Sequence, residues 1–104
     1  MKKEQFESIT KWQKETFGSA TALSKIAHLK EEIKELEIEL CFHDEPEKAL
    51  MEFADCFTLL FGAADSYGLS YELICKAIDD KMAINRKRKW GEPKANGVVN
   101  HIRD

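Results

Sequence analysis

Residues 49–64 read ALMEFADCFTLLFGAA, and their apolar side chains recur at the spacing of an α-helix that is apolar on nearly every side. Only two residues in this stretch carry a charge, Glu52 and Asp55, and they lie one helical turn apart. A carboxylate that is buried without a partner costs several kcal/mol or takes up a proton. The stretch therefore predicts a buried helix with two acidic side chains that need a partner.

Helical segments flank this stretch on both sides. The apolar spacing and the end signals predict four helices, at about residues 3–17, 21–42, 46–67 and 70–89. Gly18 and Gly68 are suited to the left-handed position that ends a helix. Asp44 is suited to an N-cap, and Pro46 to the first turn of the helix that follows. Alternation of apolar and polar residues is almost absent, so strands are not expected before residue 97.

The expected fold class is all-α, an antiparallel bundle of about four helices. The loops between the helices are short, so consecutive helices should be antiparallel neighbours. The chain has 104 residues, which is the size of one domain. Residues 1–90 should form this helical domain, and residues 91–104 should form a short, extended C-terminal tail.

The net charge of the chain is −3 at pH 7. This balance argues against a non-specific nucleic-acid or membrane binder, so neither nucleic acid nor a membrane is expected as a partner. The sequence contains neither a run of about eighteen apolar residues nor a signal-peptide core. The three cysteines are odd in number and scattered through apolar segments, which is typical of reduced thiols in a cytoplasmic protein.

The helix expected at residues 21–42 carries a second acidic pair, Glu32 and Glu35, at the same i, i+3 spacing. If this helix packs antiparallel against the one that holds Glu52 and Asp55, the two pairs converge. Four carboxylates close together repel one another unless a cation lies among them, and oxygen ligands favour magnesium or manganese over zinc. A solvated face is the commoner explanation for the first pair alone. It explains the second pair less well because the neighbours of that pair are apolar, and we favour a metal site.

Lys81, Asn85 and Arg88 lie at i, i+4 and i+7, on one face of the last expected helix. Lysine and arginine match phosphate oxygens, and asparagine can hold a ribose or a phosphate. The alternative is that basic residues near a helix C-terminus only favour the negative end of the helix dipole. That explanation suffices for the other basic residues between 86 and 89. For Lys81, Asn85 and Arg88 the spacing alone leaves both interpretations open.

Three ordered sequence elements carry a resemblance to a known family. EEIKE at residues 31–35, followed after sixteen residues by EFAD at residues 52–55, resembles the EExxE…ExxD signature of the MazG-like, all-α nucleoside triphosphate pyrophosphohydrolases. KMAINRKRKW at residues 81–90 is similar to the KxxxNxxR element of that superfamily. HLKEEIKEL and NRKRKWG look closest to its dATP/dGTP pyrophosphohydrolase branch. The resemblance covers about residues 5–92.

The resemblance implies a fold, a reaction and an assembly. The fold would be a MazG-like helical bundle that forms a homodimer or a homotetramer. The reaction would convert a nucleoside triphosphate, dATP or dGTP by branch resemblance alone, to the monophosphate and pyrophosphate. Magnesium would be the cofactor, with manganese as a substitute. A metal-bound water would attack the phosphorus next to the nucleoside.

The resemblance also implies roles for particular residues. The implied metal ligands are all acidic: Glu32, Glu35, Glu52 and Asp55. The implied triphosphate-binding residues lie on one helix face: Lys81, Asn85 and Arg88. Glu31 would be catalytic by orienting the attacking water. Two further expectations rest on position and residue type, not on the resemblance. His28 lies one turn from Glu32 and is expected to touch the substrate. Trp12, like Phe17 and Trp90, offers a ring on which the nucleobase could stack, although aromatic residues at helical spacing more often belong to a core.

Two alternatives stay open at the level of sequence. One is a relative within the superfamily that acts on dUTP, dCTP or phosphoribosyl-ATP. The other is a non-catalytic helical oligomerisation module that binds metal or nucleotide without turnover.

Overall fold

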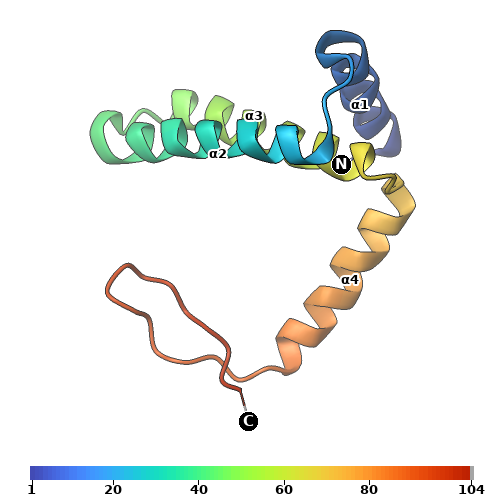
Figure 1. Cartoon of the computed structure of the whole chain (residues 1–104). Helices are drawn as coiled ribbons and strands as arrows, with labels where there is room; N and C mark the ends of the chain where they lie inside the picture. The colour runs from blue at the N-terminus through green and yellow to red at the C-terminus, as the bar shows by residue number, and fades with distance from the viewer. Residues whose placement is uncertain (104) are drawn as a thin grey trace. The chain divides into compact units, whose positions relative to one another are not determined.

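The computed structural model describes residues 1–103 and is all-α, as predicted (Figure 1). Its helices are α1 (Lys3–Phe17), α2 (Ala22–Ile38), α3 (Pro46–Ser66) and α4 (Tyr71–Lys87), and a short π-helix, η1 (Glu39–His43), follows α2 directly. The four expected helices are therefore confirmed. The chain divides into two compact units, residues 1–71 and residues 72 onward. No helix in the described range combines the length and the apolar composition needed to cross a bilayer.

The turn between α1 and α2 is fixed by local hydrogen bonds. Gly18 ends α1 with a φ of 59°, and its N–H donates to the carbonyl of Lys14 at 3.2 Å. Thr21 then caps α2, because its Oγ1 accepts from the Ser24 N–H at 3.1 Å while Ser24 Oγ accepts from the Thr21 N–H at 2.8 Å. Gly18 thus ends α1 at a positive φ, as predicted, but its ψ of −112° lies outside the left-handed helical region.

The turn between α2 and α3 differs from the prediction. Asp44 is not the N-cap of α3; it has a φ of 50° and donates its N–H to the Glu39 carbonyl, which closes the π-helical turn. Glu45 occupies the N-cap with an extended backbone and without a side-chain hydrogen bond. The reason is steric, because Pro46 disfavours a helical conformation in the residue before it. Pro46 stands in the first turn of α3, as predicted.

The first unit is built around α3. Figure 1 shows α2 and α3 side by side, and the short turn between them makes them antiparallel. The other helix, α1, packs mainly on α3 rather than alongside α2, which corrects the expectation that consecutive helices are neighbours. The rings of Phe6 and Phe61 meet edge to face with centroids 6.0 Å apart. Gln13 Nε2 donates to the Thr58 carbonyl at 2.8 Å, so α1 is also tied to α3 by a hydrogen bond.

Two polar side chains are buried where the three helices meet. Gln13 is 1% exposed and lies directly against Gly62, where a Cβ atom would collide with the Gln13 amide. Lys25 is 3% exposed, and its Nζ donates to Ser66 Oγ at 2.7 Å and to the Gly62 carbonyl at 3.4 Å. The absence of a side chain at Gly62 therefore allows α1 to approach α3 closely.

The apolar stripe of α3 is only partly covered. Ala49, Leu59 and Ala63 are buried, but Leu50 is 67% exposed and Phe57 is 58% exposed. The prediction of a helix buried on nearly all sides is therefore wrong for a single chain. The sequence pattern predicts an apolar stripe but does not specify what covers it. In the described residues of a single chain, part of this stripe faces solvent.

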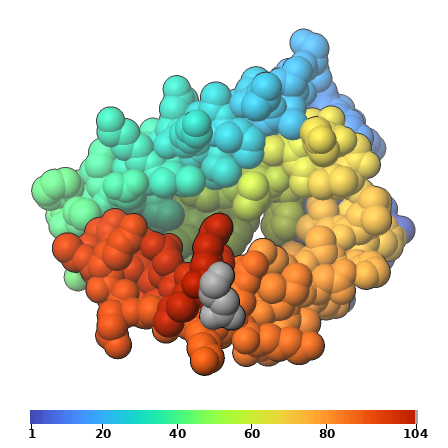
Figure 2. Space-filling view, turned by 60° about the horizontal axis from the view of Figure 1, so that its bottom comes forward, coloured from blue at the N-terminus to red at the C-terminus, as the bar shows by residue number. Residues whose placement is uncertain are grey.

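The second unit consists of α4 and a loop that turns back on itself. The Gly91 N–H donates to the Asn100 carbonyl at 2.9 Å, and the Ile102 N–H donates to the Lys89 carbonyl at 2.7 Å. The segment around residues 100–102, in dark red, therefore lies beside the orange residues that follow α4 (Figure 2). A simple extended tail is not confirmed. Within residues 1–103, strand-like pairing is limited to a single antiparallel bridge between Trp90 and His101.

Candidate active site

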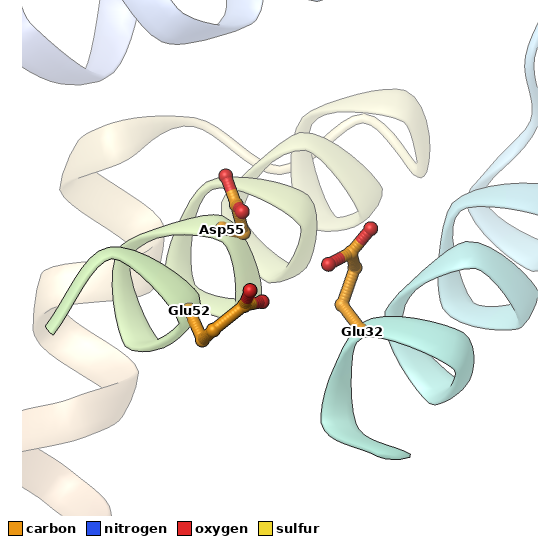
Figure 3. Close-up of side chains that lie close together, drawn as sticks. All are labelled: Glu32, Glu52 and Asp55. Carbon is orange, nitrogen blue, oxygen red and sulfur yellow. The ribbon is translucent and has the colours of Figure 1, made fainter. Parts of the chain in front are cut away.

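Three acidic side chains meet between α2 and α3. Glu32 comes from α2, and Glu52 and Asp55 come from successive turns of α3 (Figure 3). One carboxylate oxygen from each lies within 4.8 Å of the others. The i, i+3 spacing puts the two α3 residues on one face, and the antiparallel packing brings that face to Glu32. We call these three residues the acidic cluster.

The electrostatics of the acidic cluster are unfavourable without a counter-charge. Burial raises the pKa of Glu32, and the negative charges of Glu35, Asp55 and Glu52 raise it further. Burial likewise raises the pKa of Glu52, followed by the charges of Glu35, Asp55 and Glu39. Among the described residues, only His28 approaches the cluster as an ion-pair partner, with its Nε2 3.5 Å from Glu32 Oε1.

An oxygen of the cluster also lacks a hydrogen bond. Glu52 Oε2 is buried and has no donor partner within the part of the chain that the structure describes, and the same is true of Glu39 Oε1. A buried polar atom without a partner is rare in native proteins and calls for an explanation. Hard carboxylate oxygens that lack donors and repel one another fit a divalent cation such as magnesium or manganese.

The fourth predicted ligand lies beside the cluster. Glu35 is not among the three residues whose oxygens converge, but its charge raises the pKa values of both Glu32 and Glu52. Glu39, which lies in η1 and raises the pKa of Glu52, was not predicted as a site residue. The sequence does contain a signal for Glu39, since residues 32, 35 and 39 share one flank of a helical wheel.

Glu31 does not belong to the acidic cluster. It is exposed, and the described residues contain no hydrogen bond or ion pair that joins it to another side chain. The neighbouring Glu32 takes the inward position because it shares the face of the buried Leu29 and Lys25. The catalytic role of Glu31 stays a prediction.

A cavity of about 200 Å³ opens next to the acidic cluster. Its lining combines aromatic, polar and acidic side chains: Trp12, Gln13, Phe17, His28, Glu32, Asp55, Thr58 and Leu59. The rings of Trp12 and Phe17 meet edge to face at 5.5 Å, and Phe17 meets His28 in the same way at 5.9 Å. The structure therefore brings two predicted substrate-binding residues, Trp12 and His28, to one cavity beside the acids.

Two other residues of this cavity were missed by sequence reasoning. Gln13 and Thr58 carry no motif, and their places in the lining follow from the way α1 crosses α3. Thr58 also donates its hydroxyl to the Asp55 carbonyl at 3.0 Å, one turn back along α3. No local pattern predicts a contact between elements so distant in the sequence.

The predicted phosphate-binding residues lie in the second unit. Lys81, Asn85 and Arg88 follow one face along α4 and just beyond its end. Arg88 Nη1 donates to Asn85 Oδ1 at 3.4 Å, which links two of the three side chains.

Comparisons with known proteins agree with the resemblance. The profile of the dATP/dGTP pyrophosphohydrolase family matches residues 5–104. A solved structure, the Cyanophage S-2L MazG-like pyrophosphohydrolase bound to dGDP and three catalytic Mn²⁺ ions per active site, superposes with a TM-score of 0.75. The two sequences are 31% identical, and the match covers 96% of this chain and 95% of that one.

A curated relative matches over a shorter region. The Eaa protein of Salmonella phage P22 is 39% identical over 54 residues, which is 52% of this chain and 17% of that protein. This chain therefore matches only a small part of the length of that relative. The family profile and the solved structure, by contrast, match nearly the whole length of this chain. The chain belongs to the dATP/dGTP pyrophosphohydrolase family, whose members are hydrolases acting on phosphoric anhydrides, and it has the all-α, MazG-like fold.

Proposed function

We propose that the chain is a nucleoside triphosphate pyrophosphohydrolase that converts dATP or dGTP to the monophosphate and pyrophosphate with magnesium. The observation that carries this proposal is the convergence of Glu32, Glu52 and Asp55, in which Glu52 Oε2 is buried and has no donor among the described residues. Family membership supports the reaction, and the dGDP and manganese bound in the cyanophage structure support the ligand class.

The chain supplies the metal ligands and positions the substrate. Glu32, Glu52 and Asp55 would hold the cation, with Glu35 next to them as a further ligand. A bound magnesium or manganese ion supplies neutralisation of phosphate charge and a lowered pKa for its water. Three Mn²⁺ ions in the cyanophage structure support more than one ion per site. Glu31 would orient the attacking water, which requires its exposed side chain to turn toward the metal.

Other residues would bind the nucleotide itself. The aromatic cavity beside the acidic cluster is suited to the nucleoside. The ring of Trp12 offers a surface on which the base can stack, and the imidazole edge of His28 offers a polar contact to the nucleoside. Lys81, Asn85 and Arg88 would bind phosphate oxygens, since guanidinium and ammonium groups form strong charge-assisted hydrogen bonds with them.

The oligomeric state proposed is a homodimer or a homotetramer. Leu50, Phe57 and Leu60 stand in one line on α3 and are each more than half exposed. A second copy of the chain would cover this line, as the packing of a helix that is apolar on nearly all sides requires. A cytoplasmic location stays a prediction from composition.

The central experiment is a panel of dNTPs and NTPs incubated with the purified chain and either magnesium or manganese. The expected products are nucleoside monophosphate and pyrophosphate in equal amounts, with dATP or dGTP turned over fastest. The exposed Glu47→Gln variant is a matched control for Glu52→Gln, because both sites lie on α3. Metal binding without product from any nucleotide would instead identify the non-catalytic module.

A further inference from the structure

The loop that follows α4 is closed by contacts that converge on Asn85. Trp90 Nε1 donates to the Asn85 carbonyl at 3.1 Å, and Arg88 Nη1 donates to the side chain of the same asparagine. The indole of Trp90 in turn meets the imidazole of His101 edge to face, with centroids 6.0 Å apart and an interplanar angle of 81°. The antiparallel bridge between Trp90 and His101 holds the two backbones together. His101 is therefore fixed near Asn85, in the last turn of α4, and near Arg88, which follows the helix.

The positive charge around His101 comes from two segments. Partial burial lowers the pKa of the His101 imidazole, and the charges of Arg88, Arg103 and Lys81 lower it further, in that order. Lys81 and Arg88 come from the α4 side, and Arg103 comes from the returning end of the loop. We call Lys81, Arg88, His101 and Arg103 the basic cluster.

Within residues 1–103, the basic cluster forms no ion pair with an acidic side chain. The ion pairs formed by the described residues involve other cations, such as Lys14 with Asp65 and Lys76 with Asp80, and none of them includes a residue of the basic cluster. Because the positive charges of Lys81, Arg88 and Arg103 all act on His101, an anion that binds beside this imidazole would be stabilised. Two guanidinium groups and an imidazole N–H offer the forked and directional donors that match phosphate oxygens.

We propose that His101 and Arg103 are phosphate-binding residues, which the returning loop adds to the face formed by Lys81, Asn85 and Arg88. The ligand class is a polyphosphate: the triphosphate of the substrate or the pyrophosphate that leaves. This inference rests on the proposed function for its ligand, and it extends the binding site beyond the KxxxNxxR element. It also gives Trp90 a role, because its indole connects Asn85 to His101.

The test measures the binding of inorganic pyrophosphate by titration calorimetry, in a buffer with EDTA and without divalent metal. Arg103→Ala removes one charge at an exposed position near the end of the chain, so loss of folding is not expected. It should weaken pyrophosphate binding about tenfold, as expected for one charge-assisted hydrogen bond. His101→Ala should weaken it severalfold, and Arg103→Lys should retain most of the affinity.

Lys94→Ala is the matched control. Lys94 lies in the same loop and carries the same charge, but it is not among the cations that act on His101. Its substitution should leave the affinity within about twofold of the parent chain. A second readout is the KM for dGTP, which should rise in parallel with the pyrophosphate Kd while kcat stays within about threefold.

The outcomes separate this inference from the proposed function. If the parent chain binds pyrophosphate but hydrolyses no nucleotide, the proposed reaction fails and the loop variants still test the anion site. If Arg103→Ala and His101→Ala match Lys94→Ala in pyrophosphate affinity, the inference is overturned, whatever the chain hydrolyses. It is equally overturned if the parent chain does not bind pyrophosphate.

Discussion

Glu32 on α2 and Glu52 on α3 bring carboxylate oxygens within 4.8 Å of each other, and Asp55 completes the group. The pKa values of both glutamates are raised, by burial first and by neighbouring negative charge second. Such an arrangement is unfavourable for the metal-free chain and favourable for a divalent cation. Stability and metal binding should therefore respond in opposite directions when a carboxylate is removed.

Glu52→Gln tests this opposition. The variant should lose activity by about 100-fold or more, because removal of a metal ligand costs at least as much as removal of an outer-shell partner. In EDTA its melting temperature should rise above that of the parent chain, since one of three repelling charges is gone. Thermal melts with and without metal, together with the dNTP assay, measure both effects. A variant that is less stable in EDTA and fully active would exclude Glu52 as a ligand.

The raised pKa values of Glu32 and Glu52 also determine how the stability of the metal-free chain depends on pH. Both pKa values lie above the ordinary value of 4.5, so the native chain binds more protons than the unfolded chain at pH values just above 4.5. The stabilisation from these groups is complete below that value and is lost as the pH rises through the raised pKa values. In EDTA, the stability of the parent chain relative to the Glu32→Gln/Glu52→Gln variant should therefore increase from about pH 7 to about pH 5.

Urea unfolding at several pH values measures this difference. Titrating groups far from the acidic cluster contribute equally to both chains, so the comparison reports the two glutamates together with the charges that act on them, chiefly Glu35 and Asp55. With saturating magnesium the trend should reverse, because protons then compete with the metal. Parallel curves for the two chains in EDTA would contradict the raised pKa values.

Gly62→Ala tests the close approach of α1 to α3. In the interior of an exposed helix this change stabilises by roughly 0.5–1 kcal/mol. Here the added methyl group would collide with the amide of Gln13, so the free energy of unfolding should fall by about 1–3 kcal/mol instead. The Gln13→Ala/Gly62→Ala double variant should recover much of the loss introduced by Gly62→Ala, and a double-mutant cycle measures the coupling. If the changes in the free energy of unfolding caused by the two substitutions simply add, the side chains at positions 13 and 62 do not clash.

Trp12→Ala tests the nucleoside cavity. Loss of a stacking surface costs about 1–3 kcal/mol per base, so the KM for dGTP should rise about tenfold or more. The affinity for inorganic pyrophosphate should not change, because pyrophosphate has no base. Phe42→Ala is the control, since Phe42 is also an exposed aromatic residue, at 79%, but lies in η1 and not in the cavity lining. An equal effect of both variants would exclude stacking on Trp12.

Local sequence signals predicted the helices and all three residues of the acidic cluster, but not the contacts between distant elements. Helix ends depend on a few neighbouring residues, and the i, i+3 acidic pairs needed only antiparallel packing to meet. Gln13 carries no such signal, because its burial depends on Gly62 in another helix. The position of His101 depends on a ring contact with Trp90 across a loop. Asp44 was misplaced because the constraint from Pro46 on Glu45 outweighed the capping preference of aspartate.

The exposed line on α3 leads to the last prediction. Leu50, Phe57 and Leu60 repeat at intervals of seven and three residues, so they form one seam along the helix. Phe57 also borders an apolar groove of about 360 Å³ that continues onto α1 at Ile9. Large apolar side chains in a continuous line are expected to be covered by another protein surface. If the proposed oligomer forms through this seam, Phe57→Glu should place like charges opposite each other in a symmetric contact and dissociate it.

Light scattering coupled to size-exclusion chromatography measures this change. The parent chain should have two or four times the mass of one chain, and Phe57→Glu should have the mass of one. Leu23→Glu is the control, because Leu23 is 82% exposed but lies at the start of α2, away from the seam. A parent chain that is monomeric at assay concentration and still fully active would show that the seam is not an interface between copies, and the exposed phenylalanine would then need a different partner.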